Sequence, residues 1–243
     1  MEISGYVFCC LIYWFAGFTQ GVSGFGSALV ALPLLTLFLD IKEAVPLCSL
    51  MGILITLSLG WNMRRHLELK KILQLCIGCI PGIVVGVLLL KQLPETAVRT
   101  LLGVLLLGYS AYSLLADPKA RALHWMWAYV ASFFTGAIGA AFSAGGPPVI
   151  IYTALSGWSK NTVKATLTGF FMFVGPLIAI AHAVSGLTTM HVLRVGAVVA
   201  PGVLLGVWCG ILLYGRLSEQ AYRRVLYLLL AVLGAYMLVD SLF

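Results

Sequence analysis

Long apolar runs alternate with short polar segments along the whole chain. Six of these runs approach or match the roughly 20 residues that an α-helix needs to cross the hydrocarbon core of a bilayer. They cover residues 44–62, 72–90, 98–116, 165–185, 192–214 and 222–242. The pattern therefore predicts an all-α fold, a polytopic transmembrane helical bundle.

Two further apolar runs, residues 3–39 and 125–156, are too long for one span. Each is interrupted by a glycine-rich stretch, at residues 17–27 in the first run and 136–148 in the second. We therefore expect each run to form two short membrane segments on either side of a break.

The order of the runs is the same in the two halves of the chain: a long broken run comes first and three spans follow. Polar and aromatic residues also match at one constant offset, as in Glu95 with Glu219, Arg99 with Arg223 and Tyr112 with Tyr236. The sequence thus predicts an internal repeat. Its first half covers residues 1–116, a linker follows at 117–123, and the second half covers 124–243.

Positive charge indicates how the halves are oriented. If each broken run crosses the membrane an even number of times, eleven Lys and Arg residues share one side and four the other. A single crossing gives seven against eight, with no bias. Since cytoplasmic loops are enriched in Lys and Arg, we expect five plus five segments in halves of opposite orientation. The linker is then cytoplasmic and both termini lie outside, although for the first half the even crossing follows from repeat symmetry alone.

Composition excludes a soluble globule. Hydrophobic residues make up 61% of the chain and charged residues 9%, whereas charged residues are about 25% of an ordinary soluble domain. The net charge of +7 could indicate a nucleic-acid binder, but the charges lie in short loops between apolar runs and form no patch. We therefore expect the lipid bilayer as a partner and no nucleic acid.

The two glycine-rich breaks form the candidate substrate site. Unpaired backbone groups cost several kcal/mol in lipid, so a broken helix must be buried in protein or line a cavity. A helix N-terminus that follows a break presents N–H donors and a partial positive charge of about half an electron, which suits an anion. We expect substrate contacts from residues in or beside the breaks: Gln20, Gly24, Gly26, Ser27, Ser143, Gly145, Gly146 and Pro147.

Glycines can also serve only to let helices pack closely, and we favour that interpretation for Gly17 and Gly21. At the second break, Pro147 and Pro148 suit the first turn of a helix. The double proline, together with the presence of a break in both halves, favours a binding site there over simple packing.

His182 lies near the end of an apolar run, and its counterpart in the repeat is Asn62. This polar pair could add hydrogen bonds to a bound anion. His182 could also carry a coupling proton, since an imidazole titrates near neutral pH; the alternative is an interfacial histidine that faces lipid headgroups. Uncharged polar residues at cavity depth, Ser49 and Thr135 among them, are further candidates.

The sequence contains no G-x-S-x-G, H-E-x-x-H or P-loop motif. We therefore expect no enzyme, no cofactor and no metal site. The lack of a nucleotide-binding motif favours a secondary transporter or a channel over a primary pump. The short loops leave little surface for a third class, a membrane-embedded assembly partner.

The two glycine patterns, Gly17-xxx-Gly21-xx-Gly24-x-Gly26 and Gly136-xx-Gly139-x(5)-Gly145-Gly146-Pro147-Pro148, resemble those of the TauE/SafE family of sulfite exporters and related anion transporters. The resemblance covers nearly the whole chain. It departs at Ser27 and Ala28, where many members continue the glycine run, and this departure concerns the substrate more than the fold.

The resemblance implies transport of sulfite, of sulfonates such as sulfoacetate, or of related small anions, with proton coupling in some members. We expect a secondary transporter of a small anionic substrate that works by alternating access in a bacterial inner membrane. We also consider a homodimer. The alternative function is an anion channel in which the glycine-rich breaks line a continuous pore.

Overall fold

The computed structural model describes residues 3–63, 69–115, 123–213 and 219–241. Within these ranges every regular element is a helix, which confirms the all-α fold. The helices are α1 (Ile3–Ser23), α2 (Ser27–Leu35), α3 (Ile41–Met63), α4 (Leu69–Gln92), α5 (Glu95–Leu115), α6 (Met126–Phe142), α7 (Gly146–Leu155), α8 (Lys160–Val184), α9 (Met190–Leu213) and α10 (Glu219–Asp240).

Helix α4 shows why the bundle requires lipid. One face of α4 is buried, with Leu75, Cys79 and Ile83 in the core. The opposite face is equally apolar, yet Ile77 and Val84 are more than half exposed. A helix that is apolar on all sides belongs in a hydrophobic solvent. In the described ranges six helices are long and apolar enough to cross a membrane, namely α1, α3, α4, α5, α8 and α9, so the chain is a multi-pass membrane protein.

Both long runs are broken within the glycine-rich stretches, at residues 24–26 and 143–145. The pieces are unequal, however, and the expectation of two short segments holds only in part. Helix α1 has 21 residues and α6 has 17, whereas α2 has 9 and α7 has 10. At about 1.5 Å per residue, α2 and α7 reach roughly half-way across a hydrocarbon core about 30 Å thick.

Glycines bring two pairs of helices into backbone contact. A Cβ atom at Gly206 of α9 would lie 2.0 Å from the Trp14 carbonyl oxygen of α1, and one at Gly82 of α4 would lie 2.0 Å from the Phe133 carbonyl oxygen of α6. No side chain fits at such distances, so the backbones of each pair touch. Gly17 and Gly21 face α9 in the same way, which supports the packing interpretation of these two glycines.

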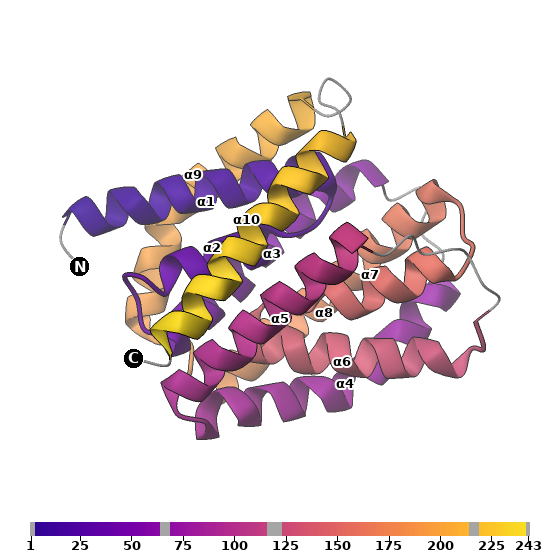
Figure 1. The fold of residues 1–243 in the computed structure, drawn as a ribbon, viewed down its shortest axis with the longest axis horizontal. Coiled ribbons are helices and arrows are strands. Elements are labelled where there is room, and N and C mark those ends of the chain that lie inside the picture. The colour runs from indigo at the N-terminus through magenta and orange to yellow at the C-terminus, as the bar shows by residue number, and fades with distance from the viewer. Residues whose placement is uncertain (1–2, 64–68, 116–122, 214–218, 242–243) are drawn as a thin grey trace.

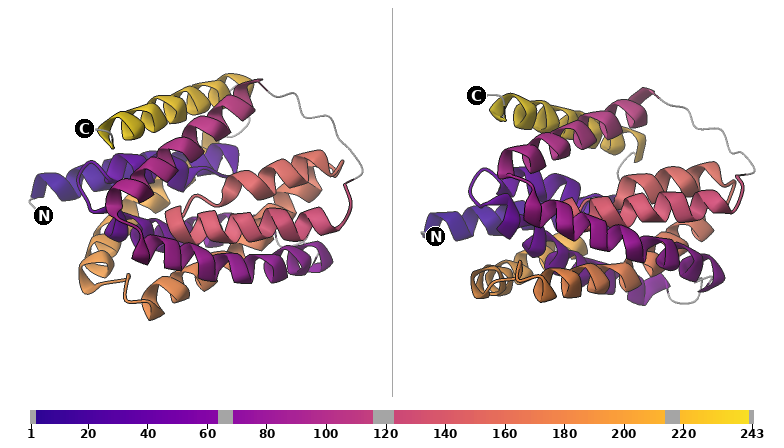
Figure 2. Two further views of the ribbon diagram at one scale, coloured as in Figure 1. Left: turned by 60° about the horizontal axis from the view of Figure 1, so that its bottom comes forward. Right: turned by 90° about the horizontal axis from the view of Figure 1, so that it is seen from below.

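The main helix contacts come in equivalent pairs: if each helix is replaced by its counterpart in the other half, an observed contact again results. The α1–α9 pair corresponds to the α6–α4 pair, and the contact of α3 with α9 corresponds to that of α8 with α4. Helix α3 packs on α8, and α5 packs on α10, so these pairs join equivalent helices. The α1–α9 and α4–α6 pairs flank the short helices (Figure 1), while α5 and α10 lie side by side along one face (Figure 2). The opposite orientation of the halves stays a prediction.

Replacement of Gly82 by alanine tests the close packing of α4 on α6. The new methyl group would meet the Phe133 backbone oxygen, so the helices must separate, and overpacking of this kind typically costs about 1–3 kcal/mol. We expect a lower thermal midpoint for the purified protein. The matched control is Gly108→Ala on the exposed face of α5, where nothing lies within 4 Å of the added atom. Equal midpoints for the two variants would contradict the packing role.

Candidate functional site

The two breaks share one backbone geometry. Gly24 has φ 81° and Ser143 has φ 52°, both in the left-handed region. The Gly24 amide donates to the Gln20 carbonyl oxygen and the Ser143 amide to that of Gly139, each at 2.7 Å. A left-handed residue of this kind ends a helix. Helices α1 and α6 therefore end in the same manner. In each half a short helix begins three residues after the left-handed residue.

Each short helix is preceded by a glycine, and the two glycines meet different structural requirements. Gly26, before α2, has φ 95°, which residues with a side chain rarely adopt. Gly145, before α7, has an ordinary φ of −70°, but a Cβ atom there would lie 2.3 Å from the Thr135 carbonyl oxygen. The first glycine thus allows an unusual conformation, and the second allows the break to lie directly against α6.

The amides that follow each break have no partner. Within the described ranges no hydrogen bond is donated by the backbone N–H of Gly26, Ser27 or Ala28 in the first half, or of Gly145 or Gly146 in the second. The first N–H groups of any helix lack an intrahelical acceptor. Pro147 and Pro148 carry no N–H, so at α7 the free donors are concentrated at the two glycines.

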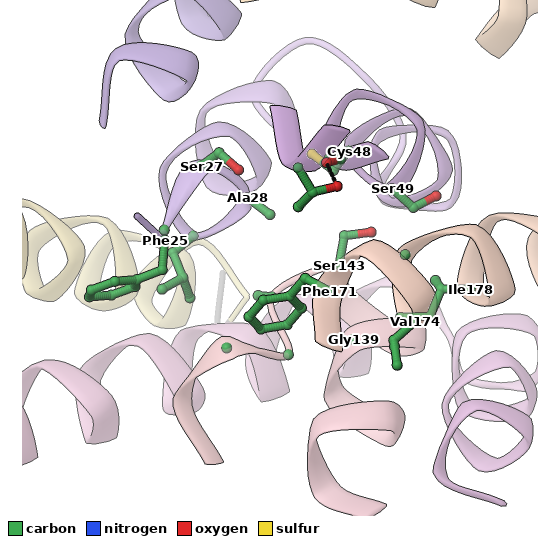
Figure 3. Close-up of a pocket in the computed structure, with 18 of the residues that line it drawn as sticks. Phe25, Ser27, Ala28, Cys48, Ser49, Gly139, Ser143, Phe171, Val174 and Ile178 are labelled. Carbon is green, nitrogen blue, oxygen red and sulfur yellow. Dashed lines mark hydrogen bonds between the residues drawn. The ribbon is translucent and has the colours of Figure 1, made fainter. Parts of the chain in front are cut away.

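These amides border a cavity of about 100 Å³ between the two breaks, α3 and α8. Figure 3 shows side chains of both halves around it, with Ser27, Cys48 and Ser49 on one side and Ser143, Phe171 and Val174 on the other. Among the described residues that line the cavity, none is Lys, Arg, His, Asp or Glu. The polar part of the wall therefore consists of backbone amides, hydroxyl groups and the Gln20 amide.

Most of the residues proposed from the sequence meet at this cavity. Those that line it are Gln20, Gly26, Ser27, Ser143, Gly145 and Gly146. Gly24 lies in the first break and Pro147 is buried in the first turn of α7, but neither is part of the cavity wall. Asn62 lies in the last turn of α3 and its side chain is outside the described part of the structure. Substrate contacts at all of these positions stay predictions.

Several lining residues on the spanning helices were missed by the reasoning from sequence. Among them are Gly52 and Thr56 of α3 and Phe171 and Gly175 of α8. The offset that relates Gly24 to Ser143 also relates Gly52 to Phe171 and Thr56 to Gly175, so these positions are equivalent in the repeat. The offset does not show which face of a helix points toward the cavity.

His182 is fully buried, and the interpretation as an interfacial histidine is therefore wrong. Its Nε2 atom lies 2.8 Å from the Ala140 carbonyl oxygen on α6, so Nε2 carries a hydrogen and donates. Its Nδ1 atom lies 3.2 Å from the Ser49 hydroxyl oxygen on α3. Ser49 lines the cavity and His182 does not. The imidazole is thus one hydrogen bond behind the cavity wall.

Fold and site together define a class: a multi-pass membrane protein with an uncharged central cavity built at two helix breaks. The sequence model described as "Sulfite exporter TauE/SafE" matches residues 9–237. The chain belongs to this family, as the glycine patterns indicated. It is also similar to a protein of Cupriavidus necator described as "Probable sulfite/organosulfonate exporter TauE". The two are 25% identical over 182 residues, which cover 73% of this chain and 71% of the relative. No solved structure matches the chain.

Adjacent glycines at the second break allow a direct test of the site geometry. Gly145→Ala places a methyl group 2.3 Å from a backbone oxygen of α6, so the break must move. Gly146→Ala meets only the flexible end of Ile150, at 3.2 Å. We expect Gly145→Ala to lower the thermal midpoint of the purified protein clearly and Gly146→Ala to change it little. A reversed order would show that the break is not held against α6.

Proposed function

We propose that the chain is a secondary transporter of a small anion, sulfite or an organosulfonate, and that the cavity between the breaks is the substrate site. The observation that carries the proposal is the meeting of two helix N-termini in one cavity, where the amides have no partner and the wall has no charged side chain among the described residues. Such amides bind anions, and each helix adds about half a positive charge. The similar protein of Cupriavidus necator is described as a probable exporter of the same substrates.

Alternating access is supported by the paired packing of the halves, because repeats of opposite orientation recur in secondary transporters. Two contacts between the halves, beside the cavity, offer the interactions that such a cycle would break and remake. The Ser143 hydroxyl of the second half donates to the Val45 carbonyl oxygen of the first at 2.7 Å, and His182 meets Ser49. In this proposal the two halves rotate relative to each other about the cavity, which opens it to one side of the membrane at a time.

The membrane orientation follows from the distribution of Lys and Arg and is part of the proposal. It puts the linker on the cytoplasmic side and both termini outside. We propose a bacterial inner membrane as the location, because the similar exporter is a protein of Cupriavidus necator. The described residues contain nothing that supports the homodimer considered above.

Replacement of Gly146 by leucine tests the site. Gly146 lines the cavity, so a leucine there should occupy the space and cover the free amides. We expect sulfite uptake into proteoliposomes to fall at least about tenfold, which corresponds to ~1.4 kcal/mol. The control is Gly108→Leu, which adds the same side chain to the exposed face of α5. Both variants should stay folded and membrane-inserted.

Wild-type uptake by Gly146→Leu would remove the proposed site. The concentration dependence in the same vesicles separates the transporter from a channel. Saturation and counterflow of labelled sulfite support alternating access, whereas flux that rises linearly with concentration supports the pore.

The role of His182 in proton coupling is tested with methanesulfonate, which keeps a single charge across neutral pH. If His182 exchanges a coupling proton, wild-type uptake of this anion varies between about pH 5 and 8. His182→Gln retains an N–H donor for the Ala140 carbonyl oxygen but cannot titrate, so its profile should be flat. An unchanged profile in the variant would eliminate the proton role and leave the anion site intact.

A further inference from the structure

Two hydroxyl groups at the breaks use their protons within the protein. Ser27 donates to the side-chain oxygen of Gln20, and Ser143 donates to the Val45 carbonyl oxygen at 2.7 Å. A hydroxyl has one proton and two lone pairs. Toward the cavity these two side chains therefore offer acceptors.

The hydroxyl groups on α3 behave in the same way. Thr56 donates to the Gly52 carbonyl oxygen at 2.8 Å, and the single Ser49 proton has two acceptors in reach, the Pro46 carbonyl oxygen at 2.8 Å and the His182 Nδ1 atom at 3.2 Å. Bonds of this kind, back to the preceding turn, are usual for Ser and Thr in helices. Ser49 is also in contact with His182, whereas the Thr56 lone pairs meet no donor among the described residues. The Thr56 hydroxyl thus offers lone pairs that no donor of the described residues uses.

The cavity wall consequently offers both donors and acceptors. Donors come from the backbone at the breaks and from the Gln20 side-chain nitrogen, which has no partner in the described ranges. Acceptors are the hydroxyl oxygens of Ser27 and Ser143 at the breaks and of Ser49 and Thr56 on α3. A ligand that uses both kinds of group needs unprotonated oxygens and an O–H group.

Charge leads to the same requirement. The two helix N-termini together supply about one positive charge, and the described lining residues supply none. A dianion would keep about one charge uncompensated inside the protein, and such burial is costly. It would also place negatively charged oxygens against the hydroxyl lone pairs of α3.

We propose that the site selects the singly charged, protonated form of a weak diprotic oxyacid, hydrogensulfite over the sulfite dianion. The amides at the breaks bind the unprotonated oxygens, and the Thr56 hydroxyl accepts a hydrogen bond from the O–H group. The inference rests on the proposed function of this cavity and specifies the form of the anion that enters it.

The test measures dissociation constants of the purified protein for sulfite and methanesulfonate by calorimetry at pH values on both sides of the second ionisation of sulfurous acid. The titratable groups nearest the cavity are the Cys48 thiol, which accepts from Tyr13, and the His182 imidazole. Titration of either would change the affinity for both anions. The readout is therefore the ratio of Kd for total sulfite to Kd for methanesulfonate.

Above the ionisation, the hydrogensulfite fraction falls with pH, so we expect the ratio to rise about tenfold per pH unit. The rise should persist in His182→Gln, because it belongs to the ligand. A ratio that is constant or falls with pH would overturn the inference but not the proposed anion site. Loss of the rise in His182→Gln would have the same two consequences. Failure of both anions to bind at every pH would overturn the proposed function itself.

A second variant identifies the acceptor. Thr56→Val removes the hydroxyl at nearly constant shape, and we expect sulfite affinity below the ionisation to fall about tenfold, as for a hydrogen bond to a charged group. Methanesulfonate, which has no O–H, should bind unchanged. The matched control is Thr100→Val on α5, where the hydroxyl bonds its own helix at 2.8 Å in the same way. Equal losses for both anions would remove Thr56 from this role.

Discussion

The structure depends on one constraint: a backbone N–H or C=O group cannot remain unpaired against lipid. Two helices nevertheless break within the bundle, and the amides after each break have no partner among the described residues. These amides can exist only because α3 and α8 pack around them. The cavity is therefore not a packing defect. It is the space in which backbone that the fold leaves unpaired can be solvated by water or by an anion.

Glycine performs two separate tasks in meeting this constraint. Along α1 and α4, glycines such as Gly17 and Gly82 remove side chains so that whole backbones can touch. At the breaks, Gly26 permits a positive φ and Gly145 permits close approach to α6. The tasks are linked, because α9 holds α1 and α4 holds α6 in place. Each break is thus attached to a long helix that is anchored along most of its length.

The helices and the positions of the breaks could be predicted from sequence because both are local properties. Runs of apolar residues specify spans, and glycine clusters specify where a span is interrupted. The lining residues Thr56 and Phe171 could not, because membrane helices are apolar on all faces and the pattern does not reveal which face points inward. The burial of His182 could not be predicted for the same reason, and an interfacial position stayed open as the alternative. Its burial depends on α3 and α6, which are distant in sequence.

The lack of charged side chains among the described residues of the cavity wall is itself a property that transport requires. A buried arginine or lysine would hold an anion through a strong interaction at low dielectric, and release would then be slow. Helix termini give a weaker field, and their donors are fixed by the backbone before the anion arrives. The hydroxyl groups are oriented in the same way, since carbonyl oxygens such as those of Val45 and Gly52 hold their protons. Discrimination among anions can therefore come from the fixed pattern of donors and acceptors, while the affinity remains low enough for release.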